Sequence, residues 1–182
     1  MEPKSTLELG VVKRMSLEEL ESFVLETSRP PFVAQSWSLV RDWCVGNMQD
    51  RELSDGQRIR WGELAVQAAR LKHREGGIHE LDAVSEEVLS RSYLIKVFGP
   101  GEPCSARDPI DLVLFSIERI GRGRDEVSRA AEDWPRLPVP DILSLRRIKN
   151  IMKPLCEVTE YLDEGSLRDD LSAWLALIPA LP

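Results

Sequence analysis

The chain has 182 residues, a formal net charge of −7 and a hydrophobic fraction of 42%. A chain of this length buries enough apolar surface to fold as one compact domain without disulfides or a structural metal. The acidic balance argues against a dedicated nucleic-acid binder. Eighteen of the 24 basic residues are arginine, which suits interfaces and salt-bridge networks, although codon bias produces the same enrichment.

The three cysteines, Cys44, Cys104 and Cys156, are far apart and form no CxxC pair. This pattern fits reduced thiols in a cytosolic protein. The first residues lack the basic and apolar stretches of a signal peptide. The longest apolar run, 173–181, is too short to cross a bilayer. We therefore expect a cytoplasmic location and no membrane partner.

Residues 1–15 are interpreted as an N-terminal arm, either a short strand or a strap packed against the domain. The first helix begins at Ser16, which forms a capping box with Glu19, and it ends before Pro30. Apolar residues at helical spacing predict further helices over about 36–48, 54–76 and 82–98.

A further helical pattern begins with Asp108 at the N-cap and Pro109 at the first helical position. Its apolar stripe extends to Trp134, but Gly121 and Gly123 interrupt it. Two glycines cost a helix about 2 kcal/mol relative to alanine. Two helices with a break between them are therefore favoured over one continuous helix.

Prolines at 135, 138 and 140 predict a stiff, extended connector. A long amphipathic helix then covers 141–163, with a kink at Pro154 because proline removes a backbone donor. A last helix begins at Ser166. No alternating strand pattern or repeat accompanies these helices.

The pattern as a whole predicts an all-α fold, an irregular bundle of six to seven helices. Residues 16–182 are interpreted as a single helical domain, with a sub-division near the proline connector at 135–140 as the alternative.

Residues able to bind a metal or act as nucleophiles do not form a recognisable set. His73 and His79, with Cys44 and Cys104, match no zinc-site spacing, so no metal or other cofactor is predicted. Cys104 is the cysteine expected to be exposed, and whether it is reactive stays open. Cys44 and Cys156 are expected in the core. Without a catalytic constellation, we do not expect an enzyme.

The densest basic group lies on the polar side of the helix predicted over 141–163. It consists of Arg146, Arg147, Lys149 and Lys153. Acidic residues follow it and no aromatic residue is interleaved, so the group fits an acidic protein partner better than nucleic acid. Three tryptophans at the edges of apolar stripes are candidate interface anchors, with partial burial in the core as the alternative. They are Trp43, Trp61 and Trp134.

These features favour a cytosolic helical protein–protein interaction module, such as an adaptor, a regulator or an accessory subunit of a larger complex. Its partner is expected to be another protein with an acidic surface. The alternative is a nucleic-acid-binding regulator that uses the basic face at 146–153.

Overall fold

The computed structural model describes residues 9–26, 34–74 and 80–182, and every regular element in these ranges is a helix. The prediction of an all-α fold is confirmed. The α-helices, in chain order, are α1 (Leu9–Val12), α2 (Leu17–Glu26), α3 (Ala34–Gln49), α4 (Asp55–Arg74), α5 (Glu80–Phe98), α6 (Pro109–Ile120), α7 (Arg124–Asp133), α8 (Val139–Met152) and α9 (Ser166–Leu175). Short 3₁₀ helices are η2 (Trp134–Arg136), η3 (Lys153–Glu157), η4 (Thr159–Tyr161) and η5 (Ile178–Ala180).

Helix α2 begins where the sequence predicts it. The Ser16 N–H donates to Glu19 Oε2 at 2.7 Å, and the Glu19 N–H donates to Ser16 Oγ at 3.2 Å, as a capping box requires. Within the arm, residues 9–12 form the short helix α1, with Val12 buried, so the strand alternative is wrong for this stretch. The predicted end of the first helix before Pro30 lies outside the described residues.

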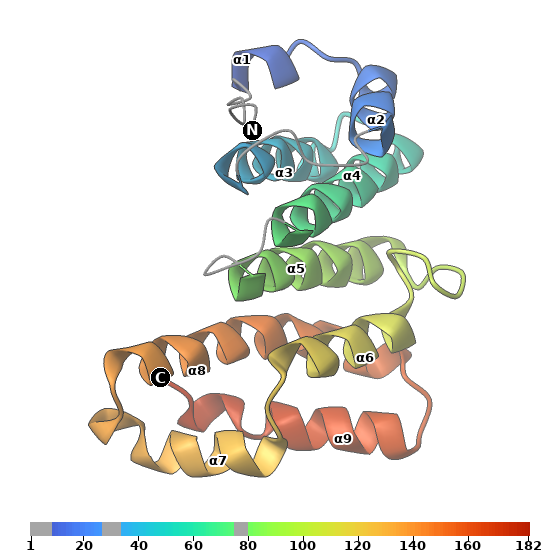
Figure 1. Ribbon diagram of the computed structural model, residues 1–182. Coiled ribbons are helices and arrows are strands. Elements are labelled where there is room, and N and C mark those ends of the chain that lie inside the picture. The colour runs from blue at the N-terminus through green and yellow to red at the C-terminus, as the bar shows by residue number, and fades with distance from the viewer. Residues whose placement is uncertain (1–8, 27–33, 75–79) are drawn as a thin grey trace.

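The helices stack in one direction, and α5 lies in the middle (Figure 1). On one side α3 packs along α4 and α4 along α5, whereas α6 to α9 lie on the other side. Two groups of buried apolar side chains fill these halves. The N-terminal cluster comprises the buried apolar residues of α1 to α4, except Ala69, together with Leu94 of α5. The C-terminal cluster comprises Val84, Val88 and Ile95 of α5 and the buried apolar residues from Leu112 to Leu181.

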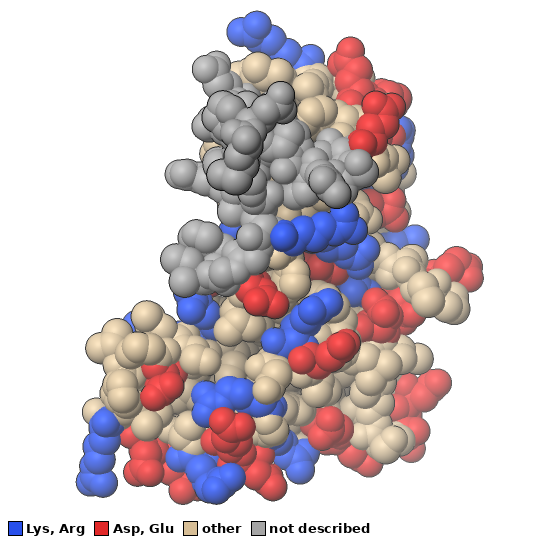
Figure 2. Space-filling view, in the orientation of Figure 1, with Lys and Arg blue, Asp and Glu red and all other residues tan. Residues whose placement is uncertain are grey.

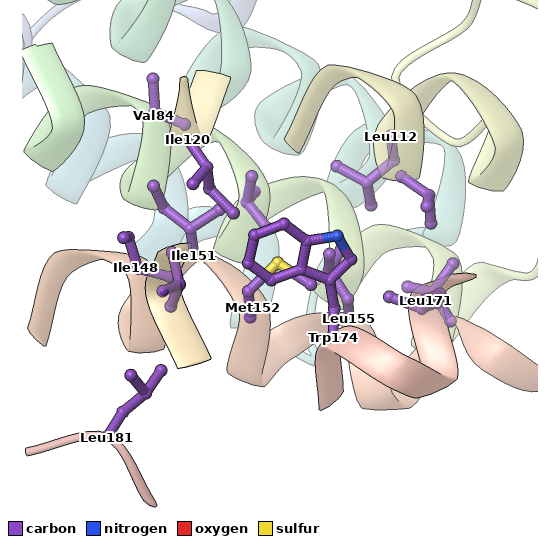
Figure 3. Packing of buried hydrophobic residues seen from close by; sticks show 14 of the residues in the cluster. Val84, Leu112, Ile120, Ile148, Ile151, Met152, Leu155, Leu171, Trp174 and Leu181 are labelled. Carbon is purple, nitrogen blue, oxygen red and sulfur yellow. The ribbon is translucent and has the colours of Figure 1, made fainter. Parts of the chain in front are cut away.

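Helix α5 therefore contributes to both clusters. Trp174 of α9 points into the middle of the C-terminal cluster, among Met152, Leu155 and Leu112 (Figure 3). The proline segment at 135–140 does not separate the clusters, because Trp134 and Leu137 on either side of Pro135 pack against the C-terminal one.

The pattern over 109–134 is divided into two helices, as favoured from the sequence. Gly121 ends α6 in the left-handed conformation, at φ 64°, and its N–H donates to Glu118 O. Glycine adopts this conformation without a steric penalty from Cβ. At the other end of α6, Asp108 caps the helix by accepting from the Ile110 N–H at 2.9 Å and the Asp111 N–H at 3.2 Å.

The prediction of one kinked helix over 141–163 is wrong. The α-helix ends at Met152, and η3 and η4 follow it. Pro154 explains the change, because its ring cannot donate a hydrogen bond and clashes with the carbonyl four residues earlier. Leu155 and Leu162 of the predicted stripe are still buried in the C-terminal cluster, but Cys156 is exposed rather than in the core.

The connector before α8 is also shorter than predicted. Pro135 belongs to η2, and Pro140 lies in the first turn of α8, where a missing N–H has no cost. Only Leu137 and Pro138 keep an extended backbone, with ψ near 150° at both residues (153° and 150°).

Candidate partner-binding groove

The basic group predicted as a partner site is divided by the fold. Arg147 Nε donates to Asp82 Oδ1 of α5 at 3.0 Å, and Lys149 Nζ donates to Leu181 O at 2.7 Å. These two cations hold α8 against α5 and the C-terminal residues. Arg146 and Lys153 are exposed and form no ion pair with any residue that the structure describes.

The three candidate tryptophans lie apart from this basic group. Trp61 is 7% exposed and belongs to the N-terminal cluster. Trp43 is partly buried against the same cluster, with Lys13 Nζ 5.5 Å from its ring centroid. Trp134 is partly buried against the C-terminal cluster. The fold therefore uses the tryptophans for packing in different places and does not bring them together with Lys153.

A groove of about 560 Å³ lies between α5 and the segment where α8 passes into η3. Its apolar wall is formed by Leu89 and Tyr93 of α5 and by Pro154 of η3. Leu89 is 50% exposed, so part of its side chain is accessible from the groove. The groove exists because α8 stops at Met152: the turn at Pro154 forms its far wall.

Cations flank the apolar part of this groove. Lys96 Nζ lies 2.9 Å from Glu157 Oε1, and this hydrogen bond and charge raise the pKa of Lys96, so the ammonium is charged at neutral pH. Lys153 also lines the groove. With two lysines and one glutamate, the lining carries an excess of positive charge in a chain of net charge −7.

Sequence reasoning found Lys153 but missed Leu89 and Tyr93. The predicted stripe of α5 runs through Val84, Val88 and Ile95, and Leu89 lies beside it. An apolar residue off the buried stripe of a helix was the available signal. That signal alone did not identify a groove, because the opposite wall is formed by Pro154. The position of Pro154 follows from the end of α8 at Met152, which was not predicted.

The cysteines and His73 form no site in the described ranges. Burial raises the pKa of the Cys44 thiol to about 12, whereas Cys104 and Cys156 are exposed. His73 Nε2 lies 3.3 Å from Glu80 Oε1, and His79 is outside the described residues.

Within 9–26, 34–74 and 80–182, no three His, Cys, Asp or Glu side chains are placed to hold a metal ion. No helix in these ranges is long and apolar enough to cross a membrane. Comparison of the chain with protein-family models, curated proteins and solved structures gives no match. In the described part of the chain, the groove with its two lysines is the feature that best fits a binding site.

Proposed function

We propose that the chain is a helical protein-interaction module whose groove binds an acidic amphipathic helix of a partner protein. The observation that carries the proposal is the half-exposed Leu89, which faces Pro154 across a groove flanked by Lys96 and Lys153. Hydrophobic grooves between helices bind partner helices through apolar residues spaced three or four positions apart.

The size of the groove supports an occupant with large side chains. Its volume, about 560 Å³, falls within the range of about 300 to 1,000 Å³ that is usual for binding pockets. Tyr93 is an amphipathic side chain of the kind enriched in interfaces, because it offers apolar area and a hydroxyl with few rotamers to fix.

The charge of the groove supports an acidic occupant. A carboxylate on the partner would complement Lys153, which is exposed and has no ion pair within the described part of the chain. Such rim contacts mainly set partner choice and association rate, whereas the apolar residues supply most of the affinity. Nucleic-acid binding by the face at 146–153 is less well supported, because Arg147 and Lys149 already bond within the chain.

Selection from a displayed library of helical peptides tests this proposal. The wild-type chain is the bait, and the Leu89→Glu variant is used for counter-selection. We expect enriched peptides with large apolar residues at i and i+4 and with several Asp or Glu residues. Their binding should fall at least tenfold with Leu89→Glu, because a buried charge replaces an apolar contact, and severalfold with Lys153→Glu.

Leu114→Glu is the matched control, since Leu114 is 54% exposed on α6 and lies outside the groove lining. This variant should bind the selected peptides as the wild type does. Enriched peptides that are basic, or that bind the Leu89→Glu variant equally well, would refute the proposal.

A further inference from the structure

A second cavity, of about 360 Å³, lies where α4, α5 and α6 meet, and arginines dominate its lining. They are Arg70 and Arg74 of α4, Arg91 of α5 and Arg119 of α6. Two carboxylates, Glu87 and Asp111, also line it, which leaves an excess of two positive charges before His73 is considered. Figure 2 shows Lys and Arg side chains, with Asp and Glu side chains beside them, over the α4–α5 region in the middle of this face.

Arg91 has an incomplete set of hydrogen bonds in this cavity. Its side chain is 0% exposed. Nε donates to Ala106 O at 3.1 Å, and Nη2 donates to Asp111 Oδ2 at 2.7 Å. Nη1 is buried and has no hydrogen-bond partner within the described residues, and it lies 3.8 Å from Glu87 Oε1. A buried charged donor without an acceptor is costly, and Arg91 lines the cavity, so an anion that entered beside it would supply the missing acceptor.

The carboxylates in this cavity neutralise only part of the positive charge of its arginines. The nearly fully buried Glu87 serves two of them, since its Oε1 also accepts from Arg70 Nε at 2.8 Å. Arg119 lies over the Phe115 ring, with 5.5 Å between Cζ and the ring centroid. Arg74 is exposed and has no ion pair in the ranges that the structure describes. Arg74 and Arg119 are thus available to an incoming anion.

We propose that this cavity binds a phosphate dianion, either free or carried by a small monoester. Guanidinium groups bond the oxygens of phosphate through paired N–H donors, and these charge-assisted bonds are stronger than neutral ones. The charge of a phosphate monoester, about −1.5 to −2 at neutral pH, matches the excess of two positive charges better than a carboxylate does.

The dimensions of the cavity fit a small ligand. Since one water occupies about 30 Å³ in the liquid, the cavity has room for on the order of ten non-hydrogen atoms, enough for a phosphate and a small organic group beside Phe115. An extended nucleic-acid backbone instead requires a track of cations along a groove, whereas these arginines converge on one cavity.

Calorimetric titration of the full chain with inorganic phosphate, phenyl phosphate and benzoate tests the assignment. We expect measurable binding of a phosphate probe and much weaker binding of benzoate. Phenyl phosphate binding more tightly than inorganic phosphate would assign the site to monoesters, and equal affinity would assign it to the free anion. Failure of both phosphate probes at millimolar concentration, or benzoate binding as tightly, would overturn the proposal.

Substitutions of exposed arginines distinguish binding in the cavity from nonspecific attraction of the anion to positive charge. Arg74→Gln and Arg119→Gln should each weaken phosphate binding about tenfold or more, since each removes a charge-assisted hydrogen bond. Both side chains belong to exposed residues, so folding is retained. Arg136→Gln, at an exposed arginine outside the cavity, should change the Kd less than twofold. Equal losses for all three variants, or an oligonucleotide competing as well as phenyl phosphate, would contradict the assignment.

Arg91 itself is best followed by NMR, because its substitution would also release the loop that it holds. Phosphate binding should slow the solvent exchange of the Arg91 guanidinium protons and shift their resonances. Unchanged Arg91 signals in a saturated complex would show that the anion binds elsewhere. The Arg74→Gln variant should still bind groove-selected peptides, so the two proposals fail independently.

Discussion

Burial divides the three thiols into two kinds of chemical environment. Cys44 is 0% exposed in the N-terminal cluster, and burial raises the pKa of its thiol to about 12, whereas Cys104 and Cys156 are exposed. Thiolates, not thiols, react with disulfide reagents. A disulfide reagent at pH 8 should therefore modify two thiols of the native protein quickly and the third only after denaturation. Rapid modification of all three, measured by absorbance and mass spectrometry, would contradict the burial of Cys44.

Asp108 shows how hydrogen bonds outweigh desolvation at a helix start. Desolvation raises the pKa of its carboxyl. The N–H donors of Cys104, Asp111 and Ile110 and the charge of Arg91 together lower this pKa by a larger amount, so the net pKa is below the ordinary value. A lowered pKa means that the ionised carboxylate stabilises the fold above the ordinary aspartate range, and this contribution is lost as the pH falls through the folded-state pKa.

Asp108→Ala should lower the free energy of unfolding by about 1 to 2 kcal/mol at pH 7, the usual cost of losing an N-cap. The difference from wild type should shrink as the pH is lowered below about 4. Urea unfolding of both proteins across this pH range checks the sign. A difference that grows on acidification would rule out the carboxylate as the stabilising form.

Among the helices, α4 approaches both α3 and α5 closely because it carries a glycine, Gly62, where it meets them. A methyl group at Gly62 would lie 2.7 Å from Met48 Sδ and 2.9 Å from Leu94 Cγ. Gly62→Ala should destabilise the protein by up to about 2 kcal/mol, since overpacking costs about 1 to 3 kcal/mol and helix propensity returns about 1 kcal/mol.

Gly46→Ala in α3 is the matched control, because nothing lies within 4 Å of a methyl group there. It should stabilise the protein by up to about 1 kcal/mol. Chemical denaturation of the two variants under the same conditions measures the difference. A Gly62→Ala variant as stable as Gly46→Ala would mean that α4 and α5 are farther apart than described.

Local signals predicted the capped helix starts and the glycine-terminated ends at Phe98 and Ile120, but not the end of α8. The capping pairs at Ser16 and the Asp108-Pro109 start were readable because each is satisfied within one turn of the chain. The end of α8 was not, because a proline inside an amphipathic pattern is compatible with either a kink or a stop, and packing decides between them. The groove depends on that choice through Pro154, so it could not be predicted from periodicity.

The two cavities depend on packing between helices far apart in sequence. The sequence pattern of α5 showed one buried stripe, formed by Val84, Val88 and Ile95. It did not show that Leu94 and Arg91 are also buried, because a single stripe identifies one buried face and α5 is buried on two faces. Arg91 became a candidate only when its contacts to Ala106 and Asp111 left Nη1 without an acceptor.

Across the whole molecule, α5 links the halves, because Leu94 packs in one cluster and Val88 in the other. Amides in the most enclosed elements exchange only through global unfolding. Native-state hydrogen exchange should therefore show the slowest amides in the middle of α5, with the same free energy of opening as global unfolding. Slower exchange in α3 and α4 than in α5 would indicate two independently unfolding units instead.

Photocrosslinking tests most directly the claim that the groove beside α5 is the surface on which this chain works. A benzophenone amino acid is placed at position 89, and at position 114 as the control, and each protein is irradiated with an acidic peptide from the helical library. We expect a covalent adduct from position 89 and none from position 114. Adducts from position 114 alone, or none from either position with a peptide that binds, would contradict it.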